Sequence, residues 1–263
     1  MTRLQWDLSG ERLFETGVRN CALYPQSSSG TYPTGVAWNG ITSITQSPTG
    51  ADANPLYADD IKYLDLRAAE EEEGTIEAYM YPDEFAVCDG SESVASGVMI
   101  HQQARKPFGL CYRTVLGNDT ELNDHGYKLH IVYGATASPS EKAYETINDS
   151  PDAITFSWDY TTVPAAVTGH KPTSSLEIDS TKADEAKLKL LEGILFGVDA
   201  PAFSSTAKYP AGSFVTYEDK VYTNPQAIDT AGSWNASNWV EVENPGPRLP
   251  LPDEVISIMT ANS

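Results

Sequence analysis

Apolar and polar residues alternate with a period of two along the middle of the sequence. The alternation runs over 127–133, 154–161 and 76–81, with shorter stretches at 108–112 and 176–178. In an extended chain successive side chains point to opposite faces, so each stretch predicts a β-strand with one buried face. Several such strands bury that face by sharing a sheet or a sandwich. We therefore expect a mainly-β or α+β fold.

One later segment has the spacing of a helix. We expect Thr181 to cap its N-terminus, with Asp184 three residues later, and Gly197 to end it. A single amphipathic helix that follows a set of strands is expected to pack on an edge or a face of their sheet. The residues on its apolar face are Ala183, Ala186, Leu190, Leu191, Ile194 and Leu195.

The chain is strongly acidic. Its 263 residues carry 17 Lys and Arg against 37 Asp and Glu, a net charge of −20. Such a chain repels a phosphate backbone, which argues against nonspecific binding of nucleic acid. With 40% hydrophobic and 21% charged residues it is still able to bury a core. The length allows one large domain, or a medium domain and a small one.

The cysteines and the N-terminus bear on the compartment. Cys21, Cys88 and Cys111 are widely spaced and form no Cys-x-x-Cys pair, so we expect reduced, buried thiols. The N-terminal residues lack an apolar stretch that would make a signal peptide, and no later run resembles a membrane span. We expect synthesis and folding in a cytoplasm and no membrane partner.

More than half of the net negative charge lies in residues 41–92. This stretch holds thirteen acidic residues, and its only basic residues are Lys62 and Arg67. Proline and glycine residues near its start predict a long excursion between strands. Two interpretations are open. It is either a solvated loop or a surface held against a partner or another polyanion.

A second, aromatic-rich unit follows residue 201. Residues 202–207 are expected to form a linker, 208–243 a small all-β module with a hairpin over 213–222, and 244–263 an extended, Pro-rich tail with a short apolar end. The module's aromatic residues are Tyr209, Phe214, Tyr217, Tyr222, Trp234 and Trp239.

Motifs that carry chemistry are missing from the sequence. It has no Gly-rich phosphate loop, no His-Glu-x-x-His pair among its four histidines and no Gly-x-Ser-x-Gly elbow. The oxygen-rich loop at 119–124 lacks the spacing of a calcium-binding EF-hand loop. With 37 acids, no particular pair is indicated for glycoside hydrolysis. We expect no enzyme activity, no metal site and no cofactor.

Seven runs, in order over about residues 1–200, together resemble the major tail protein, or tail tube protein, of bacteriophages with long non-contractile tails (siphophages). They are WNGITSI at 38–44, PLYADDIKYL at 55–64, AYMYPDEF at 78–85, FGLCYRT at 108–114, GNDT at 117–120, HGYKLH at 125–130 and TINDSP at 146–151.

The resemblance implies a β-sandwich flanked by one helix and a structural role in the virion. Hexameric rings would stack into a tube that conducts the genome into the host, with tape-measure, tail-tip and tail-terminator proteins as partners. Assembly would take place in the host cytoplasm. The acidic excursion would be an arm between subunits and rings, and acidic walls would let DNA pass without binding it. The expected contact residues of the arm are Tyr57, Tyr63, Glu70, Glu71, Glu72 and Glu73.

Residues 208–242 resemble the small, chitin-binding-like carbohydrate-binding modules appended to phage structural proteins, through YPAGSFVTY at 209–217, KVY at 220–222 and WNASNW at 234–239. The resemblance implies binding of host glycans on aromatic faces. The alternative is that the aromatic residues fill the core of a tiny domain, with Trp234 and Trp239 as the expected exceptions. The expected sugar platform is Trp234, Trp239, Tyr209 and Tyr222.

Two other functions stay open at this point. One is a host-adhesion protein whose main domain is a scaffold for the carbohydrate-binding module. The other is a cell-wall glycosidase that uses two of the acids.

Overall fold

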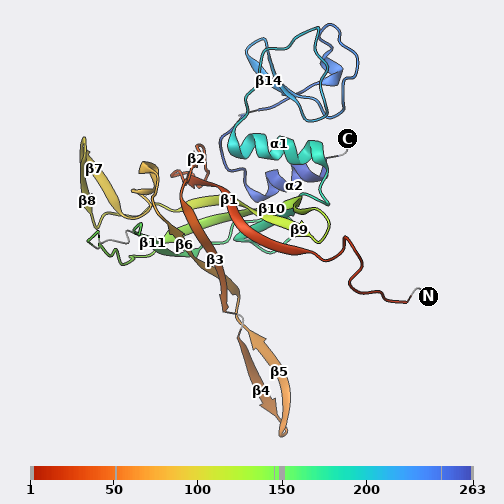
Figure 1. Ribbon diagram of the computed structural model, residues 1–263. Helices are drawn as coiled ribbons and strands as arrows, with labels where there is room; N and C mark the ends of the chain where they lie inside the picture. Colours follow the sequence, from red (N-terminus) through yellow and green to blue (C-terminus); the bar gives the residue numbers. More distant parts are fainter. Residues whose placement is uncertain (1–2, 51, 145, 148–151, 244, 262–263) are drawn as a thin grey trace.

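An eight-stranded antiparallel sheet forms the body of the chain in the computed structural model (Figure 1). The structure describes residues 3–50, 52–144, 146–147, 152–243 and 245–261. The strand order is β2-β1-β9-β10-β11-β6-β3, and β12 pairs with β10 beside this path. Three smaller sheets and two α-helices complete the fold, so the mainly-β expectation is confirmed.

The strands of the large sheet are β1 (Phe14–Pro25), β2 (Val36–Ala37), β3 (Ile41–Gly50), β6 (Glu70–Ala78), β9 (Phe108–Asn118), β10 (Leu122–Ala137), β11 (Phe156–Thr162) and β12 (Ser175–Asp179). The smaller sheets pair β4 (Ala53–Ala58) with β5 (Ile61–Arg67), β7 (Ser91–Ala95) with β8 (Val98–His101), and β14 (Lys220–Thr223) with β13 (Phe214–Tyr217) and β15 (Val240–Glu241). The helices are α1 (Glu185–Phe196), α2 (Pro252–Thr260) and the 3-10 turns η1 (Asp83–Phe85) and η2 (Ala236–Asn238).

Strand β10 shows the predicted alternation, but both of its faces are covered. Leu129 and Ile131 pack with helix residues such as Leu191, while Val132 packs on the other side with Trp158. The expectation of one buried face is wrong for this strand. The sheet lies between the two helices and a second apolar layer, so side chains on both of its faces are buried.

An aromatic cluster fills the layer on the side away from the helices. Trp158 and Phe85 are fully buried, and their ring centroids lie 5.1 Å apart. Trp38 and Tyr81 pack against both rings. Phe85 and Cys88 come from the end of the acidic stretch, so that part of the chain belongs to the core.

The N-cap of helix α1 lies three residues later than expected. The Asp184 side chain accepts a hydrogen bond from the Lys187 amide and forms the N-cap, whereas Thr181 bonds to Asp179. Asp and Thr are both favourable N-cap residues, so the sequence alone does not show which of the two caps the helix. Gly197 follows the last helical residue, as expected.

Helix α2 was not expected, because the Pro-rich run before it predicts an extended tail. Pro252 occupies the first turn, where the backbone N–H groups have no partner within the helix, so the missing N–H of proline costs nothing. Asp253 and Glu254 follow it in the same turn, where negative charge is favourable. Val255 packs beside Leu191 of α1 on the sheet. The expectation of one flanking helix is therefore wrong. The apolar end of the tail is helical, whereas residues 248–251 before it are not.

The acidic excursion consists of strands over residues 41–78. Strand β3 pairs with β6 from Ile41↔Ala78 to Gly50↔Glu70, and the β4–β5 hairpin continues beyond them. We call residues 41–78 the arm. Its far turn, Asp59-Asp60, has positive φ at both residues, as a two-residue hairpin turn requires. Figure 1 shows the β4–β5 end projecting well beyond the sheet.

The three thiols are free and buried, which confirms the expectation for them. Burial raises the pKa of Cys21 and of Cys88 to about 12, so both are protonated and unreactive at neutral pH.

Candidate assembly surface

The outer end of the arm exposes large apolar side chains with no core beneath them. Tyr57, Ile61 and Tyr63 are 70%, 65% and 69% exposed. Leu56 and Leu64 face each other across the two strands and are also exposed. An isolated two-stranded hairpin is marginally stable in water at best. The β4–β5 hairpin therefore has the properties of an element that a partner completes.

Two further projecting elements have the same character. The β7–β8 hairpin exposes four apolar side chains, and the N-terminal segment exposes three at alternate positions. The sequence analysis missed both, although each carries a signal: a Ser-Gly pair between two apolar runs in the first, and a period of two in the second. These residues are Val94, Val98, Met99 and Ile100, and Leu4, Trp6 and Leu8.

The large sheet also has unpaired strand edges. Among the described residues β3 pairs only with β6, and β12 pairs only with β10. Edges of this kind accept another strand readily, and proteins normally cover them or close them into a barrel. The edges and the projecting hairpins together form a surface suited to β-pairing and apolar contact.

The expected contact residues of the arm occupy two different places. Tyr57 and Tyr63 are at the outer hairpin, whereas the acidic run 70–73 begins β6 nearer the sheet. Glu70 and Glu71 are exposed, and Glu72 and Glu73 are half-buried. The Gln46 amide donates to Glu72 over 3.1 Å, and no ion pair to the run is present among the described residues.

Gly74 follows the acidic run at the point where β6 enters the sheet between β3 and β11. A Cβ atom there would lie 2.3 Å from the Thr45 carbonyl oxygen and 2.5 Å from the Tyr160 ring. Only glycine allows this close approach, which fixes where the arm leaves the body.

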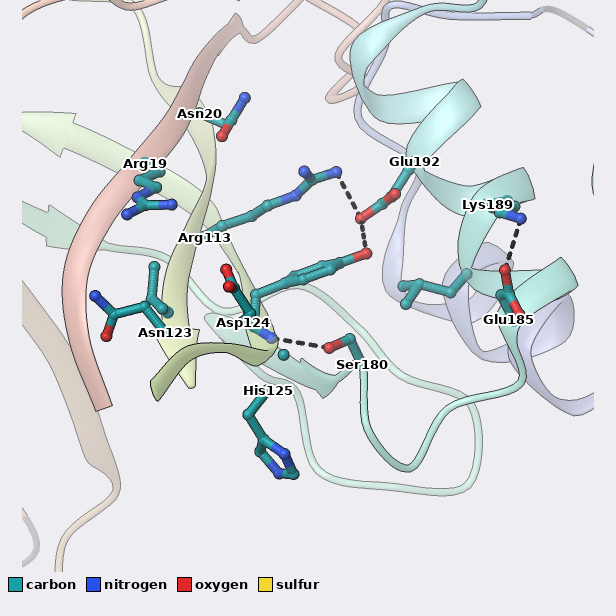
Figure 2. Close-up of a pocket in the computed structure, with 14 residues that line it drawn as sticks. Arg19, Asn20, Arg113, Asn123, Asp124, His125, Ser180, Glu185, Lys189 and Glu192 are labelled. Carbon is teal, nitrogen blue, oxygen red and sulfur yellow. Dashed lines mark hydrogen bonds and ion pairs between the residues drawn. The ribbon is translucent and has the colours of Figure 1, made fainter. Parts of the chain in front are cut away.

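A groove of about 510 Å³ lies between α1 and strands β1, β9 and β10 (Figure 2). Its central cation, Arg113, pairs with Glu192 of α1 over 2.6 Å, and the Tyr127 hydroxyl donates to the same carboxylate over 2.6 Å. Lys189 pairs with Glu185 along the helix. These charges neutralise one another and tie α1 to the sheet, an arrangement that stabilises the fold and presents no activated nucleophile.

His130 is the centre of a second polar cluster, at the junction of β1, β10 and β12. Its ring stacks on Tyr112 with centroids 4.9 Å apart, and its Nε2 lies 2.8 Å from the Thr114 hydroxyl. Glu15 and Glu177 approach the ring at 3.4 and 3.9 Å, and the Lys128 ammonium lies 3.0 Å from each of these carboxylates.

The His130 cluster predicts a loss of stability on mild acidification. Burial lowers the pKa of His130 from 6.5, although Glu177 and Glu15 oppose the shift. Between the folded and unfolded pKa values the unfolded chain binds the extra proton, so stability falls as the pH drops below about 6.5. We expect urea unfolding at pH 7.5 and 5.5 to show this loss, and His130→Gln to reduce it. An equal loss in the variant would contradict the assignment.

The four aromatic residues expected to bind sugar meet in the C-terminal module, but as a packed cluster. Trp234 stacks on Tyr217 with centroids 4.0 Å apart and on Trp239 at 5.3 Å, and Tyr222 and Tyr209 contact these indoles edge-on. Trp239 is only 7% exposed, so the expectation that it is an exception to core packing is wrong. A small module has few other apolar residues with which to form a core.

In the part of the chain that the structure describes, no group of three or more His, Cys, Asp or Glu side chains is placed to hold a metal ion. None of its described helices has the length and apolar character that crossing a membrane requires. The run at 146–151 lies mostly outside the described residues.

Comparisons with known proteins find a distant likeness among solved structures. No protein-family model matches the chain, and no curated protein matches it. Among solved structures, the chain is similar to one from the PVC sheath–tube complex of an extracellular contractile injection system in its extended state. The identity is 12%, the TM-score is 0.27, and the match covers 67% of this chain and 94% of that chain. A TM-score this low supports no argument about function.

Proposed function

We propose that this chain is a structural subunit that assembles with copies of itself into the tail tube of a siphophage. The observation that carries the proposal is the arm, whose outer β4–β5 hairpin exposes Tyr57, Ile61 and Tyr63 without any core of its own. A second copy supplies the missing partner surface. The unpaired edges of β3 and β12 provide further places where strands of neighbouring copies pair and close the sheet.

The complete assembly follows from the sequence resemblance. Rings of six copies stack into a hollow tube in the virion, with tape-measure, tail-tip and tail-terminator proteins at its inside and ends. The net charge of −20 supports a lumen through which DNA passes without being held. Each basic residue on the inner wall would add affinity for the DNA phosphate backbone. The sign of the potential on the inner wall of an assembled tube tests this part, and a predominantly basic wall would contradict it.

The C-terminal module is proposed as a decoration on the outside of the tube. Figure 1 shows it beyond α1, on the side of the body away from the β4–β5 hairpin. Binding of host glycans through Tyr209, Tyr222, Trp234 and Trp239 stays a prediction. The stacking of these rings on one another leaves less aromatic surface for sugar than the sequence implies.

Electron microscopy of the purified chain, alone and with the tail-tip complex, tests the proposal. We expect rings and long hollow tubes as the protein concentration rises. Monomers at every concentration and in both conditions would contradict it. Monomers that bind glycans would favour a carbohydrate-binding protein, and turnover of a cell-wall polysaccharide would favour a glycosidase.

A further inference from the structure

A second hollow, of about 830 Å³, lies at the foot of the β7–β8 hairpin. The loop over 139–144 forms its other side. Its charged residues are Arg105, Lys142 and Asp89, with His101 beside them, and its apolar and aromatic wall includes Tyr81, Tyr144 and Met99. We call it the Arg105 pocket.

Arg105 is held in place by the backbone around it. The Gln103 amide donates to the Gly90 carbonyl and the Lys106 amide to that of Val87, so the segment before β9 lies against the segment before β7. Gly90 has φ +75°, and a Cβ atom there would lie 3.2 Å from the Arg105 guanidinium carbon. The guanidinium therefore lies close to the Gly90 backbone, where it lines the pocket.

Among the described residues, the guanidinium of Arg105 has no carboxylate within ion-pair distance. Its Nε is buried and makes no hydrogen bond, and no ion pair to Arg105 is present among the described residues. The neighbouring cation differs, because Lys142 pairs with Asp89 over 2.6 Å. His101 is bonded through Nδ1 to the Ser91 hydroxyl, 2.8 Å away. A buried donor without a partner is costly, and guanidinium donors match carboxylate oxygens best.

We propose that the Arg105 pocket binds a carboxylate of the acidic run on the arm, Glu70 or Glu71, from a second copy of this chain. The inference rests on the proposed function and adds a specific contact to it. Both glutamates are exposed, and neither has a cationic partner among the described residues. Arg105 and the acidic run are therefore complementary in charge, and neither has an ion-pair partner among the described residues of its own chain.

The placement of the two elements suits a head-to-tail contact. In Figure 1 the arm and the β7–β8 hairpin project from the sheet in opposite directions, the arm downward and the hairpin upward. The acidic run and the pocket on one chain therefore face different neighbours. A heterologous contact of this kind repeats from copy to copy and builds an open stack, as a tube requires.

Charge reversal tests the contact on the full chain. We expect Arg105→Glu to raise the protein concentration for half-maximal tube formation about tenfold or more, and the pair Glu70→Lys with Glu71→Lys to do the same. Combining all three substitutions should restore assembly to near the original level. Lys208→Glu and Asp229→Lys, which reverse exposed charges in the C-terminal module, are the matched controls and should have little effect.

A disulfide test does not depend on the charge variants folding well. Glu71→Cys with Met99→Cys, a residue of the pocket wall, should form a disulfide between copies during assembly. Glu71→Cys with Val240→Cys, an exposed residue of the C-terminal module, should not. Tubes that form equally well with Arg105→Glu, or a Glu71–Met99 pair that fails to cross-link in assembled tubes, overturn this inference alone. A chain that never forms tubes overturns the proposed function as well.

Discussion

Replacing β4–β5 (Ala53–Arg67) by a two-residue Asn-Gly turn is expected to abolish tube formation while the subunit stays folded. The hairpin contributes exposed apolar side chains to the monomer and no residue to either core cluster. Its removal therefore costs the monomer little, whereas the assembled state loses the apolar contact that holds neighbouring copies. Sedimentation, electron microscopy and thermal unfolding of the variant measure these two effects separately.

A milder variant of the same hairpin excludes an effect of chain length. Tyr57→Ser with Tyr63→Ser keeps the arm but removes its two largest exposed side chains, and we expect it to assemble only at much higher concentration. Val240→Thr changes an exposed apolar side chain in the C-terminal module, and should assemble normally. Normal tubes from the shortened chain would show that the arm is not the contact.

Trp158→Ala is expected to destabilise the subunit by about 3–5 kcal/mol, because it leaves a large cavity in a close-packed core. The Trp158 side chain is fully buried, and its ring contacts include Trp38, Phe85 and Phe156. Its indole N–H makes no hydrogen bond, so the loss is one of packing and burial. Chemical denaturation measures the change in the free energy of unfolding.

Trp6→Ala is the matched control for this prediction. Trp6 is 72% exposed on the N-terminal segment, so the same substitution there should change the stability of the monomer by less than about 0.5 kcal/mol. Comparable losses from the two variants would contradict the assignment of Trp158 to the core.

Local patterns predicted the strands well and the chain ends poorly. The alternation at 127–133 depends only on neighbouring residues, and β10 follows it. Whether one or both faces of a strand are buried depends on which elements pack on each side of the sheet. The alternation within the strand carries no information about those elements. Pro250 and Pro252 predicted an extended tail because proline breaks the interior of a helix. Proline is also common in the first turn of a helix, and Pro252 takes that place in α2.

The assembly surface was only partly predictable. The acidic composition marked the arm, and the alternation at 76–81 predicted the end of β6. Strands β4 and β5 were missed because neither of their faces is buried, so their sequence resembles that of a loop. The aromatic residues of the module suggested a sugar platform, and only the fold shows that Trp239 is buried. The Arg105 pocket joins residues from four segments, among them Asp89, His101 and Lys142, and only tertiary structure brings them together.

The central claim is that the projecting β-elements of one copy are completed by another copy. A cryo-EM reconstruction of tubes assembled from the purified chain tests it most directly. We predict that Tyr57, Ile61 and Tyr63 are buried against a neighbouring subunit in the tube. A tube in which this hairpin stays in solvent, or a chain that forms no tube even on the tail tip, would contradict the account.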